Sequence, residues 1–288
     1  MKYVIIPMML ILLVICGSTG FAQDDWDNSG TQRDRINWKM KGNFRPFVEA
    51  NYGFGKPKQK KFEDTFANTG QIDAKIGYSE IQKYRGVVWE MDERYVFGNY
   101  LSSDAEFLRE LDGNVKMDIT RFGFGSRVGF GYHFGALALL PYNQNQFIWT
   151  RIRSTRPDSL SLNDIAILDR YENAYRFGVS TEGGAKLLLF DFLSVNASYE
   201  LSVVYPRHIF WPWLGSYVIL QTGLNAISVF SEDIVRSSKV LGPIMYFVLK
   251  NGLSYVFYTQ LQEKMNWPFN SETPLTLETI KLGASITF

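Results

Sequence analysis

The last eight residues read Lys281-Leu282-Gly283-Ala284-Ser285-Ile286-Thr287-Phe288, and they alternate strictly in character. The even-numbered residues are apolar, whereas the odd-numbered residues are small or polar. Because successive side chains of a strand point to opposite faces, one face suits lipid and the other suits water. The segment is therefore predicted to be a strand of a membrane-spanning barrel, with a half-buried strand of a soluble sheet as the alternative.

Four positions of this segment resemble the C-terminal β-signal of bacterial outer-membrane barrels. That signal has a polar residue, a glycine two positions on, and two hydrophobic residues flanking one spacer at the end; Lys281, Gly283, Ile286 and Phe288 occupy these places. The resemblance implies contact with outer-membrane lipid, insertion by the barrel-assembly machinery and a location in the bacterial outer membrane. It indicates a route of assembly rather than an activity, and it identifies no particular family.

A secretory signal is expected at the other end of the chain. Lys2 precedes an apolar run that ends at Cys16, and small residues follow up to Ala22. The run is shorter than the roughly 20 apolar residues that a membrane-spanning helix needs. A lipoprotein signal, with Cys16 as the lipid-bearing residue, is the alternative, although bulky Ile15 fits it poorly. The expected organisation is a signal peptide at 1–22, a polar periplasmic lead-in at 23–43 and an outer-membrane barrel at 44–288.

Composition narrows the class of protein further. Cys16 is the single cysteine, so removal of the signal leaves no disulfide and no cysteine metal site. Loss of Lys2 takes the 30 basic residues to 29, which equals the 29 acidic ones, so a nucleic-acid partner is not indicated. Aromatic residues make up 16% of the chain, while the mean hydropathy is only −0.12. Barrels combine these two properties, because every second strand residue faces a polar interior.

Segments of period two recur along the chain and predict eight strands. The clearest is 121–134, where phenylalanines on one face oppose a row of glycines on the other, as expected for a narrow barrel with little room inside. The fifth is less regular, with Pro141 indicating a bulge or distortion. The expected strands are 45–54, 72–79, one from about 86, 121–134, 137–153, 174–188, 193–205 and one from about 277.

The connections support an up-and-down antiparallel barrel. Long links (55–71, 102–117, 154–173 and 206–275) alternate with short ones (82–85, 135–136 and 189–192). Outer-membrane barrels have long loops outside and short turns on the periplasmic side, so both chain ends are expected in the periplasm. A soluble eight-stranded barrel is the alternative, against which the aromatic outer faces and the terminal motif weigh.

The insertion 206–275 interrupts the strand pattern. It opens with Phe210, Trp211 and Trp213, aromatic residues suited to a membrane–water boundary. Apolar residues then recur at helical spacing, which predicts helices over about 219–235 and 240–264 before the last strand. A strand interpretation of 242–261 is the alternative and would raise the strand number to ten.

Function follows less directly from these patterns. An apolar helical pair must be covered, so the insertion is predicted to act as a cap over the barrel mouth or as a docking surface for a protein of the cell envelope. Threading a helix through so narrow a lumen is the least favoured placement. The leading hypothesis is a non-enzymatic outer-membrane barrel.

Inward charges support a second hypothesis, a narrow solute channel. They are expected to form a paired polar core, and a channel would require ten or more strands or a lumen without interlocked pairs. The predicted lumen charges are Arg121, Arg127, Arg176, Glu182 and Glu200.

A third hypothesis is a hydrolase acting on lipid or lipopolysaccharide acyl chains at the barrel rim. It would need His208 beside a serine such as Ser216 and a carboxylate. An aromatic-flanked histidine is more typical of a boundary residue. His133 and His208 are expected at opposite ends of their strands, so no metal site follows. We assign no catalytic residue, no metal and no cofactor from the sequence.

Overall fold

The computed structural model describes residues 44–104, 115–135 and 137–288. The expected signal peptide at 1–22 and lead-in at 23–43 lie outside these residues. All the elements described below belong to one compact unit, Gly42–Phe288.

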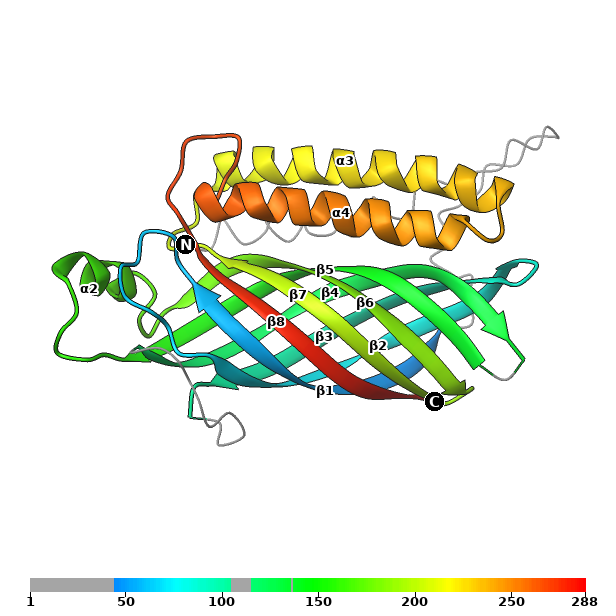
Figure 1. Ribbon diagram of the computed structural model, residues 1–288, viewed down its shortest axis with the longest axis horizontal. Helices are drawn as coiled ribbons and strands as arrows, with labels where there is room; N and C mark the ends of the chain where they lie inside the picture. Colours follow the sequence, from blue (N-terminus) through cyan, green and yellow to red (C-terminus); the bar gives the residue numbers. More distant parts are fainter. Residues whose placement is uncertain (1–43, 105–114, 136) are drawn as a thin grey trace, which may run out of the picture. The chain divides into compact units, whose positions relative to one another are not determined.

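Eight antiparallel strands form a closed barrel in which each strand pairs with its neighbours in sequence (Figure 1). The barrel closes because β1 pairs with β8, with Ala50 opposite Ala284 in the register. This confirms the up-and-down antiparallel topology. The strands are β1 (Arg45–Lys58), β2 (Thr69–Arg85), β3 (Val88–Ser102), β4 (Lys116–Phe134), β5 (Leu137–Thr155), β6 (Tyr175–Phe190), β7 (Leu193–Val204) and β8 (Leu275–Thr287).

Two long helices lie between β7 and β8, as the sequence predicts. They are α3 (Phe210–Ser237) and α4 (Gly242–Glu263). The ten-stranded alternative is wrong, because the stretch it assigned to extra strands is helix α4. A third helix, α2 (Leu162–Asp169), was not expected; Ser161 caps it by accepting a hydrogen bond from the backbone N–H of Asp164.

The two ends of the barrel differ, and we call them the turn end and the loop end. The turn end carries the short β2–β3, β4–β5 and β6–β7 connections, and two of these contain glycines at positive φ, Gly86 and Gly135. It also carries the C-terminus, since the backbone N–H of Phe288 donates to the carbonyl of Pro46 at 2.8 Å. The loop end carries the longer connections and α2.

The glycine row of β4 makes room for large side chains inside the barrel. A Cβ on Gly125 would lie 2.8 Å from the Tyr95 hydroxyl, and one on Gly123 would lie 2.9 Å from the Phe97 ring. Tyr95 and Phe97 belong to β3, whose alternation blurs after Glu93 in the sequence because these inward residues are aromatic. The strand itself continues in unbroken register to Ser102.

The outer face of the barrel is apolar and carries aromatic side chains toward both ends. The middle exposes aliphatic residues such as Ile76, Val96 and Leu282. Such an apolar band between two aromatic girdles is typical of barrels that span a membrane. The exposed aromatic residues are Tyr52, Phe54, Tyr100, Phe122 and Tyr175 toward the loop end, and Tyr78, Phe134, Phe190, Phe192 and Phe288 toward the turn end.

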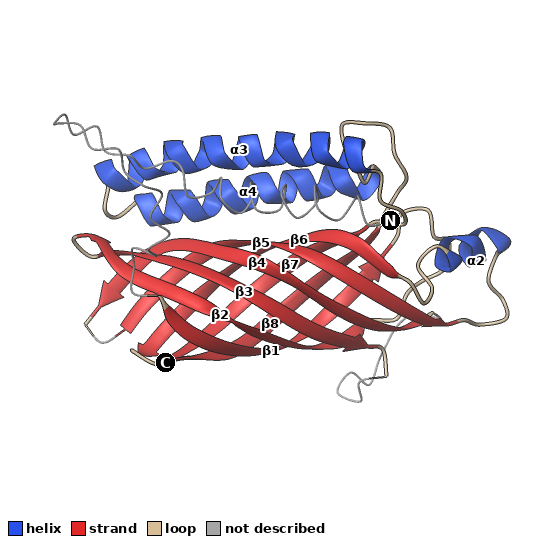
Figure 2. Ribbon diagram, turned by 180° about the vertical axis from the view of Figure 1, so that it is seen from behind, coloured by secondary structure: helices blue, strands red, loops and turns tan. Residues whose placement is uncertain are grey.

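The helical pair lies along the outer wall of the barrel and does not cover its mouth (Figure 2). The cap predicted over the mouth is therefore not the observed arrangement. The loop-end mouth is filled instead by α2 and the residues after it, because Ile167, Leu168 and Tyr171 pack into the apolar cluster formed by inward residues of the strands. A helix of this length buries more apolar surface along a wall than over a narrow opening.

Candidate functional site

The most unusual surface of the molecule is the interface between the helical hairpin α3–α4 and the barrel wall, which we call the helix–wall interface. At the loop end it is apolar and aromatic. Trp213 of α3 is buried against Phe177 of β6, with ring centroids 5.4 Å apart, and packs edge-on to Phe147 of β5 at 6.3 Å. Residues of β7 and the end of α4, with the residues that follow each of them, complete the cluster: Leu201, Val203, Tyr205, Tyr258, Leu261 and Met265.

The turn end of the interface is also apolar. Phe130 points outward from β4 yet is buried, because Tyr246 of α4 covers it with ring centroids 4.8 Å apart. Val235 of α3 belongs to the same cluster. Tyr132 donates a hydrogen bond to the carbonyl of Val240 in the turn between the two helices. The hairpin therefore follows the wall from one end of the barrel to the other.

Between these two apolar zones lies a polar contact. Asn143 points outward from β5, and its amide donates to the Asn251 side chain of α4 at 2.9 Å and to the Ser254 hydroxyl at 3.4 Å. The Asn251 amide in turn donates to the carbonyl of Tyr142 at 3.3 Å. Gly183 of β6 permits the approach, because a Cβ there would lie 2.6 Å from the Asn251 oxygen. In an apolar surrounding such bonds fix which helix face meets the wall.

A second polar contact fixes the loop end of α4. Glu278 points outward from β8 and accepts hydrogen bonds from Tyr199 at 2.9 Å and from Tyr258 of α4 at 3.4 Å. It also pairs with Lys58 of β1 at 3.1 Å. One carboxylate thus links the helix to three strands. Together with the Tyr132 hydrogen bond at the turn end, these polar contacts hold the hairpin at three separate heights on the wall.

The opposite face of the hairpin is uncovered by the described residues. Its exposed side chains are mostly apolar: Trp211, Val218, Ile219, Val229, Phe230, Ile244, Val248, Tyr255 and Val256. The stretch Phe210–Val235 is long and apolar enough to cross a membrane. The 22 residues of α4 extend about 33 Å, which is close to the roughly 30 Å hydrocarbon core of a bilayer.

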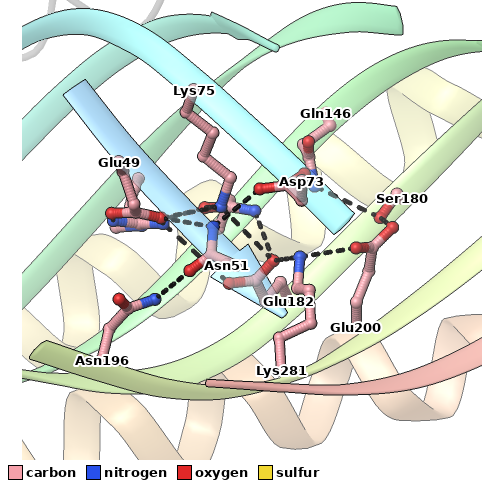
Figure 3. Close-up of polar contacts among 12 residues, drawn as sticks. Glu49, Asn51, Asp73, Lys75, Gln146, Ser180, Glu182, Asn196, Glu200 and Lys281 are labelled. Carbon is pink, nitrogen blue, oxygen red and sulfur yellow. Dashed lines mark hydrogen bonds and ion pairs between the residues drawn. The ribbon is translucent and has the colours of Figure 1, made fainter. Parts of the chain in front are cut away.

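The lumen is filled by ion pairs (Figure 3). Arg127 donates two hydrogen bonds to Glu49, both at 2.8 Å, and one to Glu93 at 2.8 Å. Lys281 lies between Glu182 and Glu200 and forms ion pairs with both. Among the described strand residues that face the lumen, five buried cations face five buried carboxylates: Lys75, Arg121, Arg127, Lys186 and Lys281 against Glu49, Asp73, Glu93, Glu182 and Glu200.

Apolar side chains close the lumen on both sides of this charge network. Leu101, Ile148 and Leu277 belong to the cluster that α2 covers at the loop end. Met91, Leu140 and Tyr142 form a second buried cluster nearer the turn end. The two conditions stated for a channel, more strands or a lumen without interlocked pairs, are therefore not met by the described part of the chain.

Four of the five predicted lumen charges come together in the structure. Arg121 pairs with Glu200 at 3.0 Å, and Arg127 lies 4.0 Å from Glu182. Arg176 differs: it is half-buried, lies near the loop end and has no carboxylate within ion-pair distance in the described residues. The four residues belong to one network because their strands face each other across a narrow interior.

The residues of the predicted insertion signal have distinct places in the barrel. Ile286 and Phe288 point outward and are exposed, whereas Lys281 is buried among the lumen carboxylates. Gly283 lies under the Asn51 side chain, whose oxygen would be 1.9 Å from a Cβ at this position. Each position therefore also has a role in the folded barrel.

The aromatic residues at the start of α3 lie at the loop end. Trp211 is exposed, Phe210 is half-buried and Trp213 packs on the wall. His208 contacts the rings of Phe177, Phe210 and Trp213, at centroid distances of 5.1 to 6.4 Å. Burial lowers the pKa of the His208 side chain. Within the described residues it has no serine or carboxylate partner, so the constellation required for a hydrolase is not present there, and no group of side chains suits a metal ion.

Sequence reasoning missed the polar residues of the helix–wall interface. The available signal was in the fifth strand, where Asn143 and Asn145 occupy outward positions that should be apolar in a lipid-facing wall. Their presence made the alternation irregular. Asn251, in the middle of an apolar helix, was the second half of that signal.

Comparisons with known proteins concern the fold alone. No protein-family model matches the chain, and no curated protein matches it. The structure of Neisserial surface protein A covers 84% of this chain and 97% of its own, with 8% identity and a TM-score of 0.34. The structure of the attachment invasion locus protein Ail of Yersinia pestis covers 85% of this chain and 99% of its own, with 8% identity and a TM-score of 0.31. The N-terminal β-barrel domain of Pseudomonas aeruginosa OprF covers 85% of this chain and 99% of its own, with 10% identity and a TM-score of 0.34.

The chain's own geometry defines its class. Eight antiparallel strands close around a polar, filled interior, and the outer wall is apolar with aromatic girdles. This is the architecture of bacterial outer-membrane barrels. The helix–wall interface adds two long helices to that architecture.

Proposed function

We propose that the chain is an integral outer-membrane barrel whose α3–α4 hairpin lies in the bilayer, against the wall, as a docking surface for an envelope protein. One observation carries the proposal: the hairpin runs the length of the barrel and is joined to it by the Asn143–Asn251 contact. The helix face turned away from the wall is apolar. Exposure of such a surface to water is unfavourable, whereas contact with lipid or with an apolar protein partner is not.

The filled lumen supports a non-enzymatic and non-transporting role. Opposing charges are paired on the axis, and apolar clusters lie on both sides of them. The surface left for function is therefore the outside of the barrel. There the hairpin is the element that a simple eight-stranded barrel lacks.

The location is tested by assembly in a Gram-negative host. We expect the full-length protein in the outer-membrane fraction, with gel migration that changes on heating, and we expect deletion of Phe288 to abolish both properties. Phe134→Ala, which removes another exposed aromatic at the turn end, is the matched control and should assemble normally. A soluble periplasmic product would overturn the location.

The docking role is tested with single cysteines, since Cys16 is the only native one and lies in the expected signal. A polarity-sensitive fluorophore at Val218 or Val229 should be quenched by brominated lipid in vesicles, whereas one at Glu63 should not. A photoreactive residue at Val229 should cross-link a protein in intact envelopes, while one at Val96, an exposed residue of β3, should not. Equal cross-linking from both positions would contradict a specific surface.

A further inference from the structure

Two arginines point outward from β5 at the loop end, above the aromatic girdle. Residues 147 and 149 of the same strand point outward, because Phe147 packs on Trp213 of α3 and Trp149 stacks on exposed Phe122. Strand alternation therefore places Arg151 and Arg153 on this face as well. Alternate residues of a strand are about 6.6 Å apart, so both guanidinium groups can reach one small anion.

Neither arginine has a carboxylate within ion-pair distance among the described residues. The buried Nε of half-buried Arg151 has no hydrogen-bond partner there. Asp118 lies opposite Arg153 in the register, but it accepts hydrogen bonds from Tyr100 and Ser102 instead. By contrast, five other basic residues of the loop end form ion pairs: Lys58 with Glu278, Lys116 with Asp104, Arg156 with Asp169, and Arg170 and Arg207 with Glu272.

The surroundings of the pair fit the polar boundary of a membrane. Tyr175 is opposite Arg151 in the register, is exposed, and contacts Phe122 edge-on at 5.3 Å. Trp149 is the next outward residue of β5 toward the middle of the barrel, and its ring stacks on that of Phe122 with centroids 5.8 Å apart. Aromatic side chains of this kind mark the headgroup level, so the arginines lie where lipid phosphates are found.

We propose that Arg151 and Arg153 form a binding site for the phosphate of a phosphorylated lipid headgroup on the loop-end side of the membrane. The proposal rests on the membrane location given under the proposed function. A guanidinium group binds phosphate through two parallel, charge-assisted hydrogen bonds. The apolar wall below Trp149 is available to the acyl chains of the same molecule.

The test uses the full-length barrel purified in detergent and titrated with diphosphoryl lipid A, with bound lipid measured by native mass spectrometry. We expect diphosphoryl lipid A to bind and its dephosphorylated form to bind about tenfold more weakly or worse. R151A/R153A should weaken binding of the phosphorylated form by about the same factor. K60A/K116A removes two exposed, ion-paired lysines of the same end and should leave binding unchanged.

Heat-modifiable migration of each variant shows whether the barrel has folded, so failure of the barrel is distinguishable from failure of the site. If R151A/R153A does not fold, R151Q/R153Q takes its place. Binding that is equal in wild type and the arginine variant, or equal for both forms of lipid A, would overturn the proposal. Displacement of the lipid by millimolar inorganic phosphate would equally overturn it, since the site would then select the free anion.

Discussion

At the scale of single residues, Asn251 joins the middle of helix α4 to the barrel wall. Its oxygen accepts from Asn143, and its amide donates to the carbonyls of Tyr142 and Phe247 at 3.3 and 2.9 Å. If α4 moved into hydrocarbon, Asn251 would keep the bond to Phe247 of its own helix but would lose those to Asn143 and Tyr142, with no water to replace them. The residue therefore favours the docked position of α4 over one displaced into lipid.

We expect a double-mutant cycle of Asn143→Ala and Asn251→Ala to give a coupling energy of roughly 0.6–2 kcal/mol. The free energy of unfolding would be measured in urea, with the protein in lipid vesicles. Asn225→Ala, on the exposed face of α3, is the control and should show no coupling to Asn143→Ala. A coupling near zero for the first pair would mean that the apolar clusters alone hold the hairpin.

At the scale of elements, the hairpin depends on a glycine of the strand beneath it. Gly183 has no room for a larger side chain because the Asn251 amide lies over it, whereas Gly98, also outward-facing, has no atom within 4 Å of its Cβ position. The two glycines therefore form a matched pair. One lies under a helix and the other faces open space.

We predict that Gly183→Val displaces α4 from the wall while the barrel still assembles. A short bismaleimide should cross-link cysteines placed at Phe130 and Tyr246, whose rings are 4.8 Å apart, and Gly183→Val should lower the yield several-fold. Gly98→Val should leave the yield unchanged. Loss of heat-modifiable migration in Gly183→Val would show instead that the strand itself cannot accept the side chain.

At the scale of the whole molecule, the barrel interior depends on balanced charge. Arg127 faces Glu49 and Glu93 in a fully buried site, and its guanidinium carbon lies 4.5 Å from the centroid of the Tyr142 ring. Removing one partner of a buried pair leaves charge that neither water nor another group can compensate. Stability therefore depends on residues from several strands at once.

We predict that Arg127→Met lowers the free energy of unfolding by about 3–5 kcal/mol. Arg94→Met, which breaks an exposed pair with Asp92, should cost at most about 1 kcal/mol. Urea titration of the vesicle-bound barrels, followed by gel migration without heating, measures both. Similar losses in the two variants would show that the lumen is hydrated well enough to screen its charges.

The closed interior has a second consequence for the whole molecule. Paired charges and apolar clusters occupy the axis throughout the described residues. We therefore expect planar bilayers containing the purified barrel to show no steady ion conductance. A stable conducting state in wild type would mean that the charge network opens in the membrane.

Alternation along the sequence by itself determined the strands, their number and the site of the helical insertion. This was possible because a period of two is a local property, imposed by the pleat on each strand separately. The pairing of β1 with β8 also follows from the sequence, because a barrel that spans a membrane leaves no strand edge unpaired. Four of the five expected lumen charges form two pairs within ion-pair distance, because inward side chains of a narrow barrel share one small interior.

The tertiary structure alone decided where the helices lie and what closes the mouth. Asn143 and Asn251 are 108 positions apart, and nothing local to either segment shows that they touch. Helix α2 is short, and its apolar residues become informative only against the inward residues of distant strands. Contacts between distant segments depend on how complete surfaces fit together, which a local pattern does not encode.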